Sequence, residues 1–363
     1  MKKVFFLLVL VCSTGSLFAQ NKESDSLVSS SIMEMEEGNF EKSKTLLEDV
    51  IKKDPYHYGA NYELAYLYAI TRQYDKGIEL LNKIEKSEEV SDRYYQLLGS
   101  LYDYKGMKSL AIVKFEEGIK KFPNSGRLYV ELGMMYHGAN DVMTALENYE
   151  KGILADPMFP SNYYYAGLIL LGSSEPVWGL MYGEIFMNLE PYTDRSKTMS
   201  NYLYETITSN VVISDTAIIA NLTSQNSLEF NQLTMSLEMP FPLLYQICFN
   251  AAGKKAVEEG FDSLELFTLG KLHEYQMEHG KAYYDIKYND PLYLYQLKIM
   301  NAGFMEDYCM LLYKGGSPED YVGWMTMNKE HYLSFMEWRE KNPLQLTQEN
   351  CFSRLTCKPI TFN

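Results

Sequence analysis

Proline recurs along the first half of the chain with a spacing of 34 residues. Pro123, Pro157 and Pro191 are each 34 positions apart, and Pro55 lies two such spacings before Pro123. A fixed period of this length is typical of a repeat protein, in which each unit buries its apolar face against its neighbour. The period divides the first half of the chain into five units, which span residues 24–57, 58–91, 92–125, 126–159 and 160–193.

Each unit is expected to form two amphipathic helices joined by a short turn. In the fourth unit the helices are expected over residues 127–137 and 142–154, and Pro157 cannot continue the second helix. The eighth and twentieth positions of every unit hold Gly, Ala or Ser, as in Gly133 and Ala145. We therefore expect the two helices of each unit to approach most closely at these small side chains.

The third and fourth units resemble the tetratricopeptide repeat (TPR) family. The family motif has a large residue at position four, Leu-Gly at seven and eight, Tyr at eleven, Ala at twenty, an aromatic residue at twenty-four and Pro at thirty-two. The matching residues are Tyr95, Leu98, Gly99, Tyr102, Ala111, Phe115 and Pro123 in the third unit, and Tyr129, Leu132, Gly133, Tyr136, Ala145, Tyr149 and Pro157 in the fourth. The resemblance implies an all-α fold, with a right-handed α-solenoid of five TPR-like repeats over residues 20–193.

The second half shows no 34-residue period but carries signals of helices. Asp290-Pro291 and Ser317-Pro318 each combine an N-cap residue with proline at the first helical position. We expect a helical C-terminal domain over residues 194–343, followed by a tail over residues 344–363.

The cysteines of the second half divide into two groups. Cys351 and Cys357 lie close together in the tail and are candidates for a disulfide bond. Cys248 and Cys309 lie in apolar, helix-like segments, where we expect buried thiols.

The N-terminus has the pattern of a secretory signal peptide. Lys2 and Lys3 precede an apolar run, and small residues lead to a cleavage site after Ala19, which makes residues 1–19 the predicted signal. Lipidation of Cys12 is the alternative, but Val11 stands where a bacterial lipoprotein has a small residue. We expect export to a bacterial periplasm, or secretion, and no transmembrane anchor in the mature chain.

Charge and motifs exclude several classes of function. The net charge of −15 disfavours binding to nucleic acid, because phosphates repel an acidic protein. His273 and His279 are six residues apart and do not share a helix face, so we expect surface histidines and no zinc site. No catalytic signature is present, and neither a cofactor nor a metal is expected.

In TPR proteins the first helices of successive repeats line a concave, ligand-binding groove. Carried over from the family, the groove positions hold Tyr62, Tyr66, Arg93, Gln96, Asp103, Arg127, Met134, His137 and Tyr164, with Tyr104 beside them. Arg93 and Arg127 are equivalent residues one repeat apart, and two such arginines could bind a carboxylate of a peptide. In the alternative interpretation, each arginine pairs with a local Asp or Glu.

The sequence predicts an exported, non-enzymatic scaffold that binds a protein or peptide. Two other functions stay open. One is a carbohydrate-binding or transport-associated helical protein, and the other is an enzyme with its site in residues 194–363. The tripeptides Asp25-Ser26-Leu27, Asp215-Thr216-Ala217 and Asp262-Ser263-Leu264 look like acceptors of periplasmic O-glycosylation, with helix N-capping as the alternative.

Overall fold

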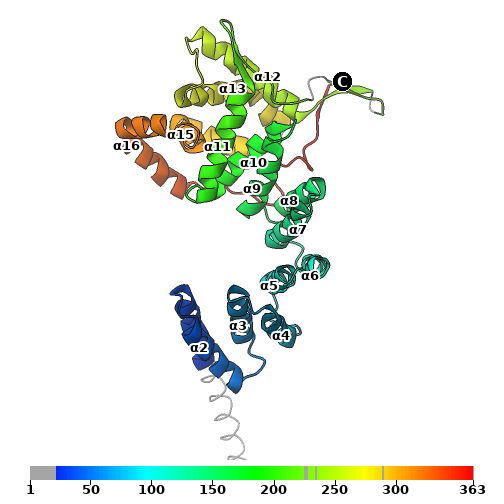
Figure 1. Cartoon of the computed structure of the whole chain (residues 1–363). Helices are drawn as coiled ribbons and strands as arrows, with labels where there is room; N and C mark the ends of the chain where they lie inside the picture. The colour runs from blue at the N-terminus through cyan, green and yellow to red at the C-terminus, as the bar shows by residue number, and fades with distance from the viewer. Residues whose placement is uncertain (1–21, 225–227, 234, 288–289, 363) are drawn as a thin grey trace, which may run out of the picture. The chain divides into compact units, whose positions relative to one another are not determined.

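In a computed structural model, the chain forms two compact units, one up to Pro123 and one over Asn124–Asn363 (Figure 1). The structure describes residues 22–224, 228–233, 235–287 and 290–362. The predicted signal peptide, including Cys12, lies outside these residues. Among the described residues, no helix has both the length and the apolar composition needed to span a bilayer.

The first unit consists of helices that pack in consecutive pairs. After a helix over residues 22–36, its helices are α2 (Phe40–Lys53), α3 (Tyr58–Ile70), α4 (Tyr74–Ile84), α5 (Asp92–Tyr104) and α6 (Lys108–Lys121). Helix α3 packs against α4, and α5 packs against α6. These pairs match the predicted second and third repeats.

The second unit begins with the two remaining repeats. Its first helices are α7 (Gly126–Gly138), α8 (Val142–Ala155), α9 (Pro160–Leu171) and α10 (Pro176–Leu189). The boundaries of α7 and α8 agree with the predicted helices of the fourth repeat to within one residue. The all-α, TPR-like prediction is therefore confirmed.

The repeat pattern continues beyond its predicted end for one more helix. Helix α11 (Asp194–Ser209) packs against α9 and α10, as the first helix of a sixth repeat would. This sixth repeat has no second helix, because the chain turns at Asn210 into a short hairpin of β1 (Val211–Ile213) and β2 (Ile218–Ala220). Helix α15 (Met305–Tyr313) contacts α11 instead, and the following Gly315 and Gly316 lie against Asn201 and Tyr204 of α11.

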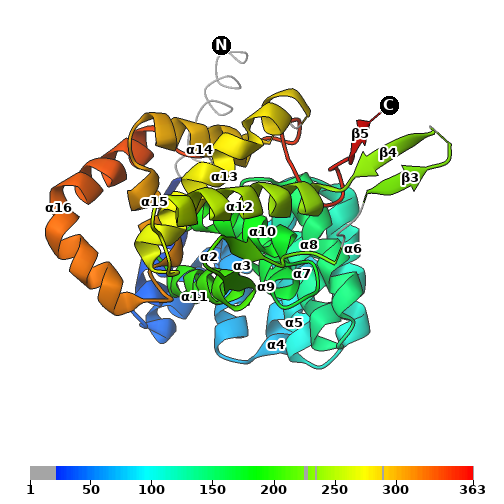
Figure 2. The same ribbon diagram turned by 90° about the horizontal axis from the view of Figure 1, so that it is seen from above.

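Four more helices and a small sheet complete the second unit. The helices are α12 (Phe241–Glu258), α13 (Leu266–Lys287), α14 (Pro291–Asn301) and α16 (Pro318–Lys341). Both predicted starts are confirmed, with Asp290 and Ser317 as the N-cap residues of α14 and α16. Strands β3 (Glu229–Asn231), β4 (Ser236–Met239) and β5 (Ile360–Phe362) form an antiparallel sheet that extends away from the helices of the second unit (Figure 2).

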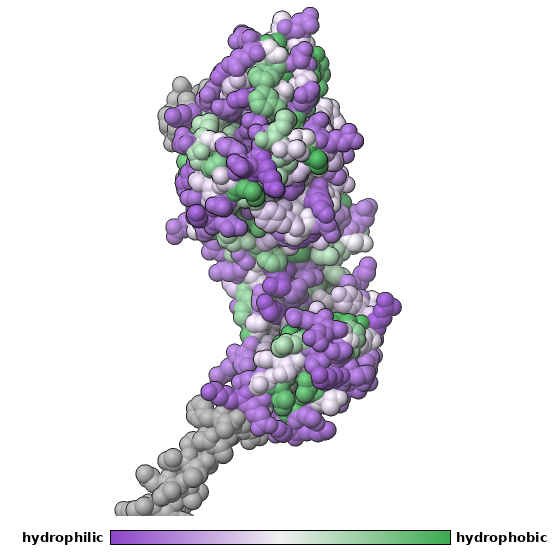
Figure 3. Space-filling model, turned by 90° about the vertical axis from the view of Figure 1, so that its left-hand side faces the viewer, coloured by the Kyte–Doolittle hydropathy of each residue, from purple (hydrophilic) through white to green (hydrophobic). Residues whose placement is uncertain are grey.

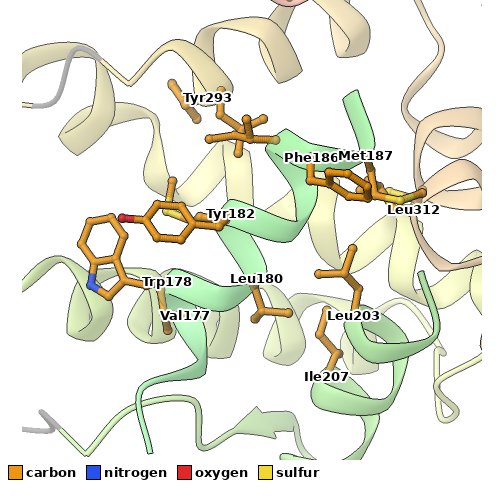
Figure 4. Close-up of a cluster of buried hydrophobic side chains, with 14 of the residues drawn as sticks. Val177, Trp178, Leu180, Tyr182, Phe186, Met187, Leu203, Ile207, Tyr293 and Leu312 are labelled. Carbon is orange, nitrogen blue, oxygen red and sulfur yellow. The ribbon is translucent and has the colours of Figure 1, made fainter. Parts of the chain in front are cut away.

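Helix α10 is the centre of the core of the second unit. All residues from Pro176 to Met187 are buried, so this helix is enclosed on every side. Figure 4 shows its large side chains, including Trp178 and Phe186, surrounded by side chains of other elements. Those labelled there are Leu203 and Ile207 of α11, Tyr293 of α14 and Leu312 of α15.

The residues after α16 are anchored to the second unit. We call residues 344–361 the C-terminal strap. Leu344, Leu346 and Ile360 are each at most 5% exposed, and Phe352 packs against the rings of Trp178 and Phe241 at centroid distances of 5.6 and 5.0 Å. The predicted tail is thus held in place by burial of its apolar side chains, without regular structure before β5.

Of the two predictions about the cysteines, the buried thiols are confirmed and the disulfide is wrong. Cys248 and Cys309 are buried thiols, as predicted, and burial raises the pKa of Cys248 to about 11. The predicted Cys351–Cys357 disulfide is not formed. Cys351 Sγ instead faces the carbonyl oxygen of Ile153 in α8 at 3.8 Å, while Cys357 Sγ faces the Lys358 carbonyl oxygen at 3.8 Å.

The three Asp-(Ser/Thr)-aliphatic tripeptides lie in different local structures. Asp25-Ser26-Leu27 is inside the first helix, and residues 262–264 lie in the loop before α13. Asp215-Thr216-Ala217 belongs to the β1–β2 turn, where the Ala217 N–H donates to Ser214 Oγ at 3.1 Å. For that tripeptide the helix N-cap interpretation is wrong.

The small residues of the repeats make room for aromatic rings. A methyl group added to Gly133 would lie 2.3 Å from Tyr149 Cε1, and one added to Gly99 would lie 2.3 Å from Phe115 Cε1. In both repeats the residue at position eight is therefore covered by the aromatic residue at position twenty-four.

We expect Gly133→Ala to destabilise the fourth repeat by about 1–3 kcal/mol, because the fully buried ring of Tyr149 cannot move away from the added methyl group. Gly138→Ala in the same helix is the matched control, since a methyl group there meets nothing within 4 Å. Thermal unfolding of the two variants measures the difference. Equal unfolding midpoints would contradict this packing.

Candidate functional site

Six of the predicted groove residues lie on two neighbouring first helices of the first unit. Tyr62 and Tyr66 are one turn apart on α3, and Arg93, Gln96, Asp103 and Tyr104 lie on α5. Helices α3 and α5 contact each other. Tyr66 is 46% exposed, Tyr104 is 58% exposed, and Ile70 continues the row of Tyr62 and Tyr66 by one more turn at 42% exposure. We call Tyr62, Tyr66 and Tyr104 the aromatic row.

Two further rings stand beside the aromatic row. Tyr58 stacks on Tyr62 at a centroid distance of 6.1 Å, and Tyr74 packs against Tyr104 at 5.5 Å. The face of the molecule shown in Figure 3 has patches of hydrophobic residues among hydrophilic ones; tyrosine is not coloured as hydrophobic on this scale. Side chains that serve only to pack one helix on another are normally buried, so this exposure is available for binding.

Arg93 has a local acidic neighbour on the same face. Burial raises the pKa of Glu63 on α3, and the positive charge of Arg93 opposes that shift. This arrangement agrees with the alternative interpretation, in which the arginine interacts with a local carboxylate.

The other groove residues belong to the second unit. Arg127, Met134 and His137 lie on α7, where Met134 and His137 are exposed. The guanidinium carbon of Arg127 lies 5.6 Å from the ring centroid of Phe159. Since Arg93 and Arg127 belong to different units, their stacking stays a prediction.

Tyr164 on α9 is half-buried under an arginine that the sequence analysis did not single out. Arg195 of α11 stands at the repeat position of Arg93 and Arg127, two spacings after Arg127. Its guanidinium pairs with Glu190, donates to Ser161 Oγ at 3.0 Å and lies 5.1 Å from the ring centroid of Tyr164. At this repeat position the arginine is fully engaged by local partners.

A buried ion pair joins the C-terminal strap to the fourth and fifth repeats. Glu150 of α8 is fully buried, and its two carboxylate oxygens accept bonds from Arg354 Nε at 2.8 Å and Nη2 at 2.5 Å. Tyr182 OH donates to Glu150 Oε1 at 3.0 Å and accepts from the Arg354 backbone N–H at 2.9 Å. We call these three residues the strap clamp.

A second group of buried polar residues surrounds a cavity of about 30 Å³ inside the second unit. Its lining includes Glu184 of α10, His273 and Gln276 of α13, the N-cap residue Asp290 of α14, and Gln296 in the middle of α14. All five residues are at most 7% exposed. We call this space the polar cavity.

Glu184 is held by neutral donors. Its Oε1 accepts from Gln296 Nε2 at 2.5 Å and from Tyr308 OH at 2.7 Å. His273 Nε2 lies 3.8 Å from the same oxygen, beyond hydrogen-bonding distance. The expectation that His273 is a surface residue is wrong, whereas His279 is exposed as expected.

Asp290 combines a structural and an electrostatic role. Its Oδ1 accepts from the Leu292 N–H at 2.9 Å and caps α14. Complete burial raises the pKa of its carboxyl group to about 7, which outweighs the opposing effect of the N–H bonds. The negative charge of Glu184 raises this pKa further.

The polar cavity is too small for an organic substrate. A water molecule needs about 10–15 Å³, so there is room for about two, whereas ligand pockets usually measure hundreds of cubic ångströms. Among the described residues, no group of three His, Cys, Asp or Glu side chains is placed to hold a metal ion. The polar cavity contains a His–acid pair, His273 and Glu184, with the two side chains 3.8 Å apart.

The sequence analysis missed both the strap clamp and the polar cavity. A signal for Glu184 exists, because it is the one charged residue in the apolar sequence PVWGLMYGEIFMNL of α10. Glu150 also follows Tyr149, a core position of its repeat. In both cases a carboxylate interrupts a stretch that packing requires to be apolar, which predicts a specific buried partner.

Comparison with known proteins found one family model that matches part of the repeats. Residues 34–101 match the family model described as "Tetratricopeptide repeat". No curated protein matches the chain.

Several solved structures are similar to about half of the chain. One is PilF of Pseudomonas aeruginosa, with 19% identity over 52% of this chain and 85% of that chain, and a TM-score of 0.45. Another is MamA, with 24% identity over 44% and 94% of the two chains and a TM-score of 0.37. A third is TTC0263 of Thermus thermophilus, with 15% identity over 50% and 98% and a TM-score of 0.42. Superposition at these scores is partial, so nothing about function follows from them.

We expect Arg354→Met to destabilise the second unit by on the order of 3–5 kcal/mol, because it leaves the carboxylate of Glu150 buried without a cation. The double variant Glu150→Gln, Arg354→Met should recover part of this loss. Denaturant unfolding of the single and double variants gives the coupling between the two residues. Additive losses would contradict the strap clamp.

We expect Asp290→Asn to remove a pH-dependent loss of stability. The pKa of Asp290 is higher in the folded chain than its ordinary value of 3.8, so the folded state binds the proton more tightly and stability falls as pH rises from about 4 to about 7. Asparagine keeps the N-cap oxygen without ionising. At pH 8 the variant should therefore gain more than about 1 kcal/mol relative to wild type, and at pH 4 this gain should be absent.

The measurement is the free energy of unfolding of both proteins between pH 4 and pH 8. Asp262→Asn, in a loop outside the polar cavity, is the matched control. Parallel curves for wild type and Asp290→Asn would show that Asp290 does not titrate in this range.

Proposed function

We propose that this chain, whose residues 34–101 match the tetratricopeptide-repeat family, is an exported, non-enzymatic scaffold that binds a protein or peptide on the first helices of its N-terminal repeats. The observation that carries the proposal is the aromatic row on α3 and α5. Tyr66 and Tyr104 in this row are 46% and 58% exposed, and Tyr residues contribute strongly to binding at protein interfaces.

The composition of this face fits an extended peptide. Tyrosine offers a broad apolar surface with a hydroxyl at its end, which suits a segment with mixed side chains. Arg93 and Gln96 lie on α5, beside the aromatic row, and supply polar groups. Arg93 could exchange its interaction with Glu63 for a bidentate bond to a carboxylate of the partner.

Export is part of the same proposal. The basic and apolar N-terminus supports it, and the cleavage site is placed after Ala19. The signal peptide and the repeats together suggest a scaffold in the periplasm that binds one end of an envelope protein.

We expect Tyr66→Ala to weaken peptide binding about tenfold or more, because it removes an exposed aromatic contact. Tyr56→Ala is the matched control, since Tyr56 is 71% exposed but lies in the turn before α3. The probe is a library of random twelve-residue peptides displayed with free carboxyl termini. Selected peptides are then measured by titration calorimetry against the three proteins.

Arg93→Lys tests the carboxylate contact separately. Lysine keeps the charge but loses the planar fork, so binding should fall by roughly 1–3 kcal/mol if a bidentate bond is made. Amidation of the selected peptides should produce a similar loss in wild type and a smaller one in Arg93→Lys. If Tyr66→Ala and Tyr56→Ala bind equally, the aromatic row is not the binding face.

A further inference from the structure

The polar cavity gathers hydrogen-bond acceptors. Gln296 directs its amide nitrogen to Glu184 Oε1, and Gln276 directs its amide nitrogen to the Tyr245 carbonyl oxygen at 3.4 Å. The carbonyl oxygens of both amides therefore point elsewhere. Among the described residues, neither of these two oxygens nor Glu184 Oε2 accepts a hydrogen bond, although both glutamines are only 7% exposed.

The charges around the cavity are unbalanced. Glu184 and Asp290 contribute two carboxyl groups, and His273 is the one basic group among the described lining residues, which include neither Lys nor Arg. Burying a carboxylate without a cation is unfavourable, as the strap clamp illustrates by placing Arg354 on Glu150. The polar cavity thus has both the charge and the open acceptors that suit a cation.

Size and geometry narrow the class of cation. The space of about 30 Å³ accepts a body of one or two heavy atoms. No set of three His, Cys, Asp or Glu side chains among the described residues is placed to coordinate a metal. An ammonium group, in contrast, needs acceptors at hydrogen-bonding distance, and amide and carboxylate oxygens both serve.

We propose that the polar cavity binds a small ammonium group, with Glu184, Gln276 and Gln296 as acceptors. The ligand is either the free ammonium ion or a primary amine with a single carbon. Binding would tie α10, the central helix of the core, to α13 and α14. This site is independent of the aromatic row, which lies in the other unit.

The test is the thermal unfolding midpoint of the full chain at pH 8 in chloride salts of equal ionic strength. Ammonium and methylammonium should raise the midpoint by about 3–5 °C for each tenfold increase above the dissociation constant. Potassium has no hydrogen-bond donors and tetramethylammonium is too large, so both should raise it less. A larger effect of methylammonium than of ammonium would identify the amine as the ligand.

Glu184→Gln keeps an acceptor for Gln296 and Tyr308 but removes the charge, so it should lose the response to ammonium. Glu205→Gln is the matched control, because Glu205 is an exposed acid on α11. Gln276→Met removes one acceptor without changing the charge and should raise the dissociation constant for ammonium about tenfold. This second variant provides the test if Glu184→Gln does not fold. Equal responses to ammonium and potassium, or an unchanged response in both cavity variants, would overturn the proposal.

Discussion

The burial of α10 is the constraint on which the second unit depends. A helix that is apolar on every face must be covered on every face. Its own repeat supplies α9, the following helix α11 packs on it, and Tyr182 reaches Glu150 of α8. Further cover comes from elements late in the sequence, namely α12, α14, α15 and the C-terminal strap. The residues after the repeats therefore complete the core of the fifth repeat. The polar cavity lies where these later helices contact α10.

The repeats could be predicted because their information is local. Gly133 and Tyr149 are sixteen residues apart, and the equivalent contact of Gly99 with Phe115 lies one period earlier. A single sequence thus shows the same structural solution several times. The helix starts at Asp290 and Ser317 were predictable for a similar reason, since an N-cap and its proline are adjacent in the chain.

The features that were missed depend on residues far apart in the sequence. Arg354 and Glu150 are separated by 204 positions, and Tyr308 and Glu184 by 124. Nothing near Arg354 marks it as the partner of a buried acid. The same holds for His273, whose surroundings in the sequence are polar although α13 buries it against α10 and α14. The continuation of the repeat into α11 was missed because a lone first helix lacks the second half of the repeat signature, even though Arg195 and Tyr204 stand at repeat positions two and eleven.

The second unit contains two buried glutamates with opposite environments. Glu150 receives a bidentate guanidinium, so its charge is balanced and the C-terminal strap is needed for that balance. Glu184 receives only neutral donors, and a second carboxyl group, Asp290, faces the same space. In an apolar surrounding, a carboxylate without a cation is retained only if the net charge is reduced by a proton or by a ligand. The raised pKa of Asp290 is the first of these responses, and the open acceptors of Gln276 and Gln296 provide for the second. The two glutamates thus differ in consequence: replacing Glu150 affects how the chain is held together, whereas replacing Glu184 affects what the core can bind.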